Sequence, residues 1–224
     1  MKNNSQSGFT LIEIAIVLVI IGLLLGGVLK GQELINSAKV KNLANDFKNV
    51  PVFIYGYQDK YKAVPGDDKA ADTHVGGIVA TTPATKQGNG IIDGAWDTTT
   101  QTDESWLFWQ HIRLAGFGPG STDTTNASSD YIPKNAVGGD IGVTNATTNS
   151  PITAAPGPGP GLKGTYIVCS GSIPGKFAKQ LDTTLDDSNT ATGSVMVLDP
   201  GAAKTSIATT SVNDDTPYTV CMGY

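Results

Sequence analysis

Residues 8–13 read GFTLIE, and residues 14–29 continue as an apolar run without a charged side chain. Glu13 is therefore the single charged residue in a segment long enough to cross a bilayer, which takes about 20 residues at about 1.5 Å rise per residue. A carboxylate at the centre of a transmembrane helix costs on the order of 3 kcal/mol, so such a group usually has a functional partner. The stretch predicts a membrane-spanning helix whose carboxylate serves a function.

A short polar leader precedes the apolar run. Met1 to Ser7 contains one charged residue, Lys2. Cleavage after Gly8 would leave an ammonium group on Phe9, one helical turn before Glu13, and the two groups could pair between neighbouring copies. The arrangement predicts a subunit that polymerises from the membrane.

Residues 8–13 resemble the processing site of type IV prepilins and of type II secretion pseudopilins, and the resemblance covers residues 1 to about 35. It implies that prepilin peptidase cuts between Gly8 and Phe9 and methylates the new Phe9 amine. It also implies that Glu13 pairs with the Phe9 amine of an adjacent subunit during assembly. Many pilins have a proline where this chain has Lys30, so a helix that loosens there would do so at nearby glycines. These are Gly22, Gly26, Gly27 and Gly31.

The resemblance also implies a location and a set of partners. The leader faces the cytoplasm for processing, so the chain is anchored in the inner membrane with its head in the periplasm. The expected partners are prepilin peptidase, an inner-membrane assembly platform, and copies of the chain or related pilins in a filament. A cell-surface type IV pilus and a periplasmic pseudopilus are both open at this stage, as are major and minor subunit roles.

Two other classes of segment combine a polar leader with an apolar run. A secretory signal peptide has an apolar core of roughly 7–15 residues and a small-residue cleavage site beyond it. Here the run from Phe9 to Leu29 is longer, and no Ala-x-Ala site follows. A plain signal anchor explains the length but not Glu13. A signal-anchored periplasmic binding module that does not polymerise is therefore the alternative to a filament subunit.

The composition of the remainder favours a single loop-rich α+β domain. Charged residues make up 16% of the chain, which also contains 27 glycines and 12 prolines. We expect a leader at 1–8, a transmembrane helix at 9–30, an amphipathic helix at 31–62, and a pilin-like head at 63–224 with a small antiparallel sheet on the first helix. The net charge of −5 argues against general nucleic-acid binding, which needs a basic surface.

The amphipathic half of the first helix is predicted from its period. Pro51 removes one backbone hydrogen bond, so we expect a kink there and a helix end between Gly56 and Lys62. Two separate helices are the alternative. The apolar seam has spacings of three and four residues, as a helix requires, at Val40, Leu43, Phe47, Val50 and Ile54.

Two further helices are predicted after the first. One spans 103–115 and ends before Gly116, and the other spans 176–185. The first of the two is too apolar to face solvent, so its large side chains should fill the core, with an aromatic recognition platform as the alternative. These side chains are Trp106, Leu107, Phe108, Trp109, Ile112 and Leu114.

Short strands and long loops complete the predicted head. The strands are Tyr166–Cys169, Val195–Leu198 and Tyr218–Met222, each bounded by Gly, Pro or Asp turns. The stretches 119–130 and 144–161 are low in complexity, and the alternating Gly and Pro of the second cannot form a helix or a central strand. We expect both as surface loops, where related subunits would differ.

The chain has two cysteines, Cys169 and Cys221, each at the end of a predicted strand. In an oxidising compartment such a pair favours a disulfide. The bond would stabilise the head by about 4 kcal/mol through chain entropy and would tie the last strand to the domain. Type IV pilins resemble this chain in carrying a disulfide-bounded C-terminal region. Two buried free thiols are the alternative.

Acidic residues crowd a glycine-rich stretch after Pro65. Oxygen side chains alternating with glycines can fold around Ca²⁺, which takes about 6–8 oxygen ligands, and some pseudopilins bind calcium in the head. The EF-hand pattern is absent, and ordinary turn chemistry is the alternative. The candidate calcium ligands are Asp67, Asp68, Asp72, Asn89 and Asp93, and a second acidic cluster comprises Asp182, Asp186 and Asp187. No other cofactor is expected.

Catalytic signatures are absent from the sequence. His74 and His111 are the only histidines, and Ser170 has no nearby His or Lys arrangement that would make it a nucleophile. The chain contains no Gly-x-Ser-x-Gly elbow, zinc-ligand spacing or phosphate-binding glycine loop. We therefore expect a structural protein and not an enzyme.

Overall fold

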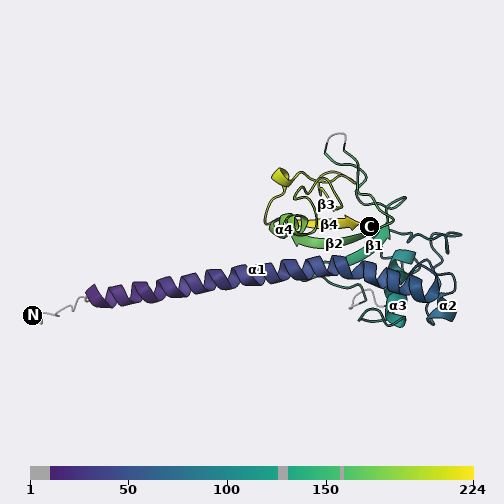
Figure 1. Ribbon diagram of the computed structural model, residues 1–224, viewed down its shortest axis with the longest axis horizontal. Helices are drawn as coiled ribbons and strands as arrows, with labels where there is room; N and C mark the ends of the chain where they lie inside the picture. The colour runs from purple at the N-terminus through teal and green to yellow at the C-terminus, as the bar shows by residue number, and fades with distance from the viewer. Residues whose placement is uncertain (1–10, 126–130, 157–158) are drawn as a thin grey trace, which may run out of the picture. The chain divides into compact units, whose positions relative to one another are not determined.

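The computed structural model describes residues 11–125, 131–156 and 159–224 (Figure 1). The predicted processing-site residues Gly8 and Phe9 therefore lie outside the described residues. The chain divides into two compact units, Met1–Lys39 and Val40–Tyr224. One helix, α1 (Leu11–Tyr61), contributes residues to both.

The described part of the first unit is the apolar half of α1. An 18-residue window of this helix has a mean hydropathy of 2.8 and is 0% buried. Among the described residues, no other helix is long and apolar enough to cross a membrane. The large apolar side chains are exposed from Leu11 (89%) to Ile35 (58%). An exposed apolar surface of this extent indicates a membrane or protein contact, in agreement with the predicted anchor.

In the second unit, α1 buries one face in the head. The helix passes through Pro51 without interruption and ends at Tyr61, so the alternative of two separate helices is wrong. The predicted seam is confirmed, because none of its members is more than 7% exposed. The members are Val40, Leu43, Phe47, Val50 and Ile54.

Two shorter helices follow. The single-turn helix α2 (Ala71–His74) has no counterpart among the predicted elements. Helix α3 (Glu104–Leu114) matches the predicted helix at 103–115. Its residues from Trp106 to Trp109 and Ile112 are at most 4% exposed, so they fill the core and the aromatic platform is wrong. The prediction that Leu114 fills the core is wrong, because this last residue of α3 is 37% exposed.

The four strands form one antiparallel sheet in the order β1-β2-β4-β3. The predicted α+β fold with a small antiparallel sheet is thus confirmed. Helix α4 (Gly175–Leu185) follows the second strand directly, and a short 3₁₀ turn (Thr209–Ser211) precedes the last one. The strands are β1 (Ile141–Asn145), β2 (Tyr166–Pro174), β3 (Val195–Val197) and β4 (Pro217–Gly223).

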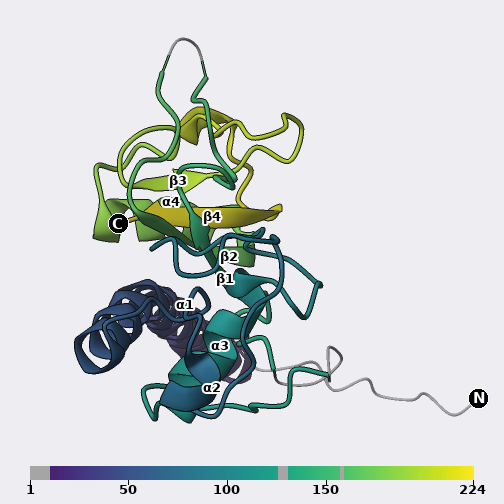
Figure 2. The same ribbon diagram turned by 90° about the vertical axis from the view of Figure 1, so that its right-hand side faces the viewer.

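Both faces of the sheet are covered by other parts of the head. Successive side chains of a strand point to opposite faces, so strands such as β2 and β4 contribute to both core clusters. On one face, Val168 and Val220 join the main core together with Phe177 of α4 and the buried residues of α1 and α3. On the other face, Cys169 and Cys221 join a smaller cluster that includes Ile152 and Leu162 from the preceding loop. Figure 2 shows α3 and the head portion of α1 on one side of the sheet and loops on the other.

The prediction of a surface loop at 144–161 is wrong at its start. Thr144 and Asn145 belong to strand β1 and are fully buried. The sequence obscures this strand, since Gly142 interrupts its apolar character. The glycine is required there, because a Cβ at this position would collide with the carbonyl oxygen of Trp96. The other predicted loop, 119–130, contains no helix or strand in its described part, residues 119–125.

Candidate functional site

Glu13, the predicted assembly residue, lies in the first turn of α1. Its neighbours Ile12 and Ile14 are 66% and 48% exposed, so the surface around this position is apolar. Cleavage after Gly8 and pairing with the amine of Phe9 stay predictions, because both residues lie outside the described range.

In the head, neighbouring donor groups hold the predicted calcium ligands in place. The carboxylate of Asp67 accepts the backbone N–H groups of Gly88 (2.5 Å), Asn89 (3.2 Å) and Gly90 (2.7 Å). Burial raises the pKa of Asp67, although these three N–H groups oppose the shift. Gly88 and Gly90 have φ angles of +78° and +88°, which glycine adopts without strain. The loop at 88–90 therefore wraps the carboxylate with its own backbone donors.

Asp93 is fully buried and is joined to Asp67 through Asn89, whose backbone N–H donates to Asp67. Its carboxylate accepts hydrogen bonds from the side-chain amides of Asn89 (3.0 Å) and Asn145 (3.1 Å). Because the amide nitrogen of Asn89 faces Asp93, the amide oxygen instead accepts the N–H of Ile91 at 2.9 Å. Asn89 therefore presents a donor to Asp93, where a shared cation would require an oxygen.

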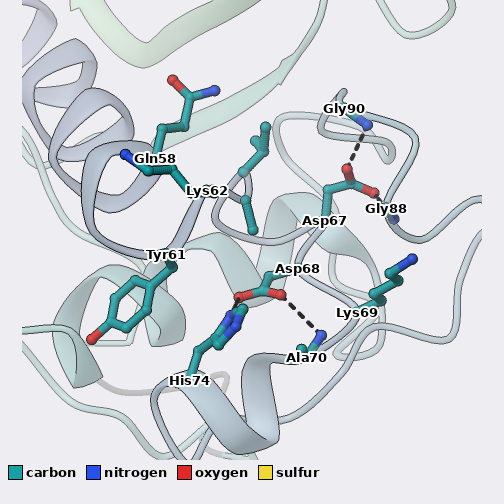
Figure 3. A pocket seen from close by; sticks show the side chains of 12 residues that line it. Gln58, Tyr61, Lys62, Asp67, Asp68, Lys69, Ala70, His74, Gly88 and Gly90 are labelled. Carbon is teal, nitrogen blue, oxygen red and sulfur yellow. Dashed lines mark hydrogen bonds and ion pairs between the residues drawn. The ribbon is translucent and has the colours of Figure 1, made fainter.

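Asp68 lines a pocket of about 470 Å³ at the C-terminal end of α1 (Figure 3). It accepts hydrogen bonds from the Tyr57 hydroxyl (2.7 Å) and the Ala70 N–H (2.9 Å), and it lies 2.6 Å from Nδ1 of His74. Burial acts to raise the pKa of Asp68, but hydrogen bonds from His74, Ala70 and Tyr57 outweigh it and lower the pKa. This carboxylate is therefore committed to an imidazole and a phenol.

The contact between Asp68 and His74 is a feature that the sequence reasoning missed. A carboxylate that orients an imidazole is one part of a general-base arrangement. The residues that line the pocket also include Tyr61, Lys62 and Lys69.

The remaining predicted ligand, Asp72, is exposed, and its carboxylate accepts the N–H (2.8 Å) and the hydroxyl (3.1 Å) of Thr73. In the part of the chain that the structure describes, the acidic side chains that could share one metal ion are those of the second cluster. One ligand atom from each of Asp182, Asp186 and Asp187 lies within 4.8 Å of the other two.

Cys169 and Cys221 form the predicted disulfide, so the alternative of two free thiols is wrong. The two residues lie directly opposite each other on β2 and β4, and both are 0% exposed. The C-terminus is held a second time, because the Tyr224 hydroxyl donates a hydrogen bond to the carbonyl oxygen of Phe47 in α1 at 2.7 Å. The last strand is therefore fastened both to the sheet and to the helix.

Residues 3–29, which contain Glu13 and the apolar run, match the family described as the prokaryotic N-terminal methylation motif. The chain carries the class III signal peptide of type IV pilins and pseudopilins. No curated protein and no solved structure matches the chain. The motif supports a type IV pilin-like precursor that is processed by prepilin peptidase, and together with the apolar half of α1 it indicates anchoring in a membrane.

In the head, Glu104 is fully buried beside Asp67 and Asp93. Its Oε2 accepts the N–H of Asp93 at 2.7 Å. Burial raises the pKa of Glu104 from 4.5 to about 7, and the two neighbouring carboxylates add to this shift. Because the folded state holds this proton more tightly than the unfolded state, the resulting stabilisation is complete below pH 4.5 and is lost as the pH rises through about 7.

We therefore expect Glu104→Gln to raise the free energy of unfolding by about 3 kcal/mol at pH 8 and to leave it nearly unchanged at pH 4.5. Urea unfolding of the full chain in detergent, followed by tryptophan fluorescence, measures both values. The matched control is Asp97→Asn, an exposed carboxylate whose replacement should change stability by less than about 0.5 kcal/mol. A difference between Glu104→Gln and wild type that is the same at both pH values would contradict the prediction.

Proposed function

We propose that this chain is a structural subunit of a type IV pilus or of a type II secretion pseudopilus. The match of residues 3–29 to the N-terminal methylation motif carries the proposal. Helix α1 supports the proposal. Its apolar side chains are exposed in the part that belongs to the first unit, whereas one face of the helix is buried in the head from Val40 onward. A subunit of this kind uses one helix first as an anchor and then as a building element.

In this proposal, prepilin peptidase removes residues 1–8 and methylates the amine of Phe9. The apolar half of α1 then holds the subunit in the inner membrane with its head in the periplasm. On assembly the exposed apolar side chains exchange lipid for neighbouring helices. That exchange brings little hydrophobic gain, since lipid tails are as apolar as leucine. An ion pair between Glu13 and the amine of the next subunit therefore supplies direction and register to the addition.

Processing is tested by the intact mass of the protein isolated from its native host. The expected chain begins at Phe9, lacks Met1 to Gly8 and carries a methyl group on its amine. Gly8→Val should accumulate as the uncut precursor, because it changes the residue at the cleavage site. The matched control is Ser7→Ala, one position earlier, which should be processed like wild type. A native chain that still contains Met1 to Gly8 would contradict the proposal.

A further inference from the structure

We infer that Asp182, Asp186 and Asp187 form a binding site for a hard divalent cation, and that calcium is the ion that fits it. The site lies at the C-terminal end of α4, where the chain turns into the segment that leads to β3. It is formed by head residues alone, so the inference is independent of the proposed filament function.

The three carboxylates are close enough to share one ion. Their ligand atoms lie within 4.8 Å of one another, and two oxygens on opposite sides of a calcium ion are about 5 Å apart, because each Ca–O distance is about 2.3–2.6 Å. Burial decreases across the group, since Asp182 is buried, Asp186 is intermediate and Asp187 is exposed. The group therefore extends from an exposed carboxylate to a carboxylate in the interior.

Asp182 points to a missing ligand on independent grounds. It is 0% exposed, and neither of its carboxylate oxygens makes a hydrogen bond within the described residues. A buried carboxylate without hydrogen bonds is strongly unfavourable. The buried carboxylates of Asp67 and Asp93 differ in this respect, because backbone and side-chain N–H groups satisfy them. Asp182 therefore lacks the hydrogen bonds that the head provides to Asp67 and Asp93.

The surroundings of Asp182 are negative. Among the described residues, no salt bridge involves any of the three carboxylates. Helix α4 has no basic residue in its last turn, and a helix C-terminus itself carries partial negative charge. Burial, followed by the charges of Asp187 and Asp186, raises the pKa of Asp182 to about 7. A bound proton would neutralise the group but would leave its oxygens without hydrogen-bond partners, whereas a cation supplies both charge and ligation.

The other two carboxylates are held in place by the loop that follows α4. Oδ2 of Asp186 accepts the N–H groups of Ser194 (2.5 Å) and Val195 (2.9 Å), and Asp187 accepts the N–H of Asn189 at 2.9 Å. All donors to an ion here are oxygens, which select hard cations such as Ca²⁺ and Mg²⁺. Calcium suits the site better, because Mg²⁺ requires near-ideal octahedral geometry and releases its water reluctantly.

The test is a calcium titration of the full chain in detergent after treatment with a chelator. Isothermal calorimetry should show one Ca²⁺ per chain. With a Kd on the order of 0.1 mM, 10 mM CaCl₂ should raise the Tm by roughly 5–10 °C above an NaCl control of equal ionic strength. MgCl₂ at the same concentration should give a smaller shift.

Variants then place the ion. Asp182→Asn should weaken Ca²⁺ binding at least tenfold, by the order of magnitude expected for a lost charged ligand, and should be at least as stable as wild type in chelator. Asp187→Asn, at the exposed side of the site, should weaken Ca²⁺ binding while leaving the interior intact. This variant tests the site if Asp182→Asn does not fold. The matched control Asp72→Asn removes an exposed carboxylate of the other acidic stretch and should keep the full calcium shift.

Three results would overturn the inference. The first is a wild-type Tm and calorimetric signal that do not respond to 10 mM CaCl₂ beyond the ionic-strength control, which would mean that Asp182 is simply protonated or hydrated. The second is a full calcium shift in both Asp182→Asn and Asp187→Asn. The third is loss of the shift in Asp72→Asn with retention in Asp187→Asn, which would place the ion in the other acidic stretch.

Discussion

Loss of the disulfide between Cys169 and Cys221 is expected to lower the free energy of unfolding by about 4 kcal/mol, because the bond closes a loop of 52 residues and restricts the unfolded chain. That is a large share of the roughly 5–15 kcal/mol that stabilises a typical domain. The double variant Cys169→Ala/Cys221→Ala should therefore unfold about 8–16 °C below wild type. Urea and thermal unfolding of the full chain in detergent measure the two effects.

Reduction of the wild type separates the covalent bond from packing. Both sulfur atoms are buried in the smaller core cluster, so alanine also removes packed atoms. Wild type that is unfolded and refolded with a reductant keeps its sulfur atoms and should still lose most of the stability that the double variant loses. The reductant should have no effect on the double variant. A loss below about 1 kcal/mol in the reduced wild type would contradict the chain-entropy explanation.

The elements that could be predicted from sequence are those with a strong local signal. The seam of α1 from Val40 to Ile54 repeats at the helical period, and every member is buried. The strands β2, β3 and β4 are short apolar runs between turn residues, and they form one sheet. Local patterns also placed Cys169 and Cys221 each at the end of a predicted strand, although only the register shows that the two strands pair and that the cysteines face each other.

The elements that could not be predicted depend on contacts between distant residues. Strand β1 carries Gly142, which looks unfavourable until the carbonyl oxygen of Trp96 is seen against it. Whether Asn89 and Asp93 can be joint calcium ligands depends on which atoms their side chains present. The Asp93 carboxylate accepts the side-chain amides of Asn89 and of Asn145, which lies 52 residues later in the chain. Sequence spacing brings candidate ligands near one another but does not show which atoms they present.

The second acidic cluster illustrates a signal that was available. Asp182 lies in the last turn of a predicted helix at 176–185, and Asp186 follows directly after the helix ends. Asp187 follows directly, where the helix ends and the chain can turn back. The sequence cannot reveal that Asp182 is buried without hydrogen bonds among the described residues, because that depends on how α4 packs on the sheet. Burial, more than spacing, separates a candidate ion site from an ordinary acidic helix end.

Glu13→Leu is expected to abolish most incorporation into filaments while leaving membrane insertion intact or improved. The substitution removes the charged residue from the first turn of α1 and thereby lowers the cost of inserting the helix. It also removes the group that would pair with the amine of Phe9 on a neighbour. An interaction on the order of 3 kcal/mol corresponds to roughly a hundredfold in an equilibrium constant, so a drop of at least about tenfold in filament content is expected.

The measurement is the amount of each variant in sheared or isolated filaments, relative to the amount in the inner membrane, in cells that lack the native copy. Glu13→Asp, which keeps the charge with a shorter reach, should fall between wild type and Glu13→Leu. The matched control is Glu33→Leu, which removes an exposed glutamate of the same helix that pairs with Lys30, and it should assemble nearly like wild type. If Glu13→Leu subunits entered filaments as efficiently as wild type, pairing with the amine would not direct assembly. The carboxylate would then have another role in the membrane, and an anchored, non-polymerising module would become the better interpretation of the chain.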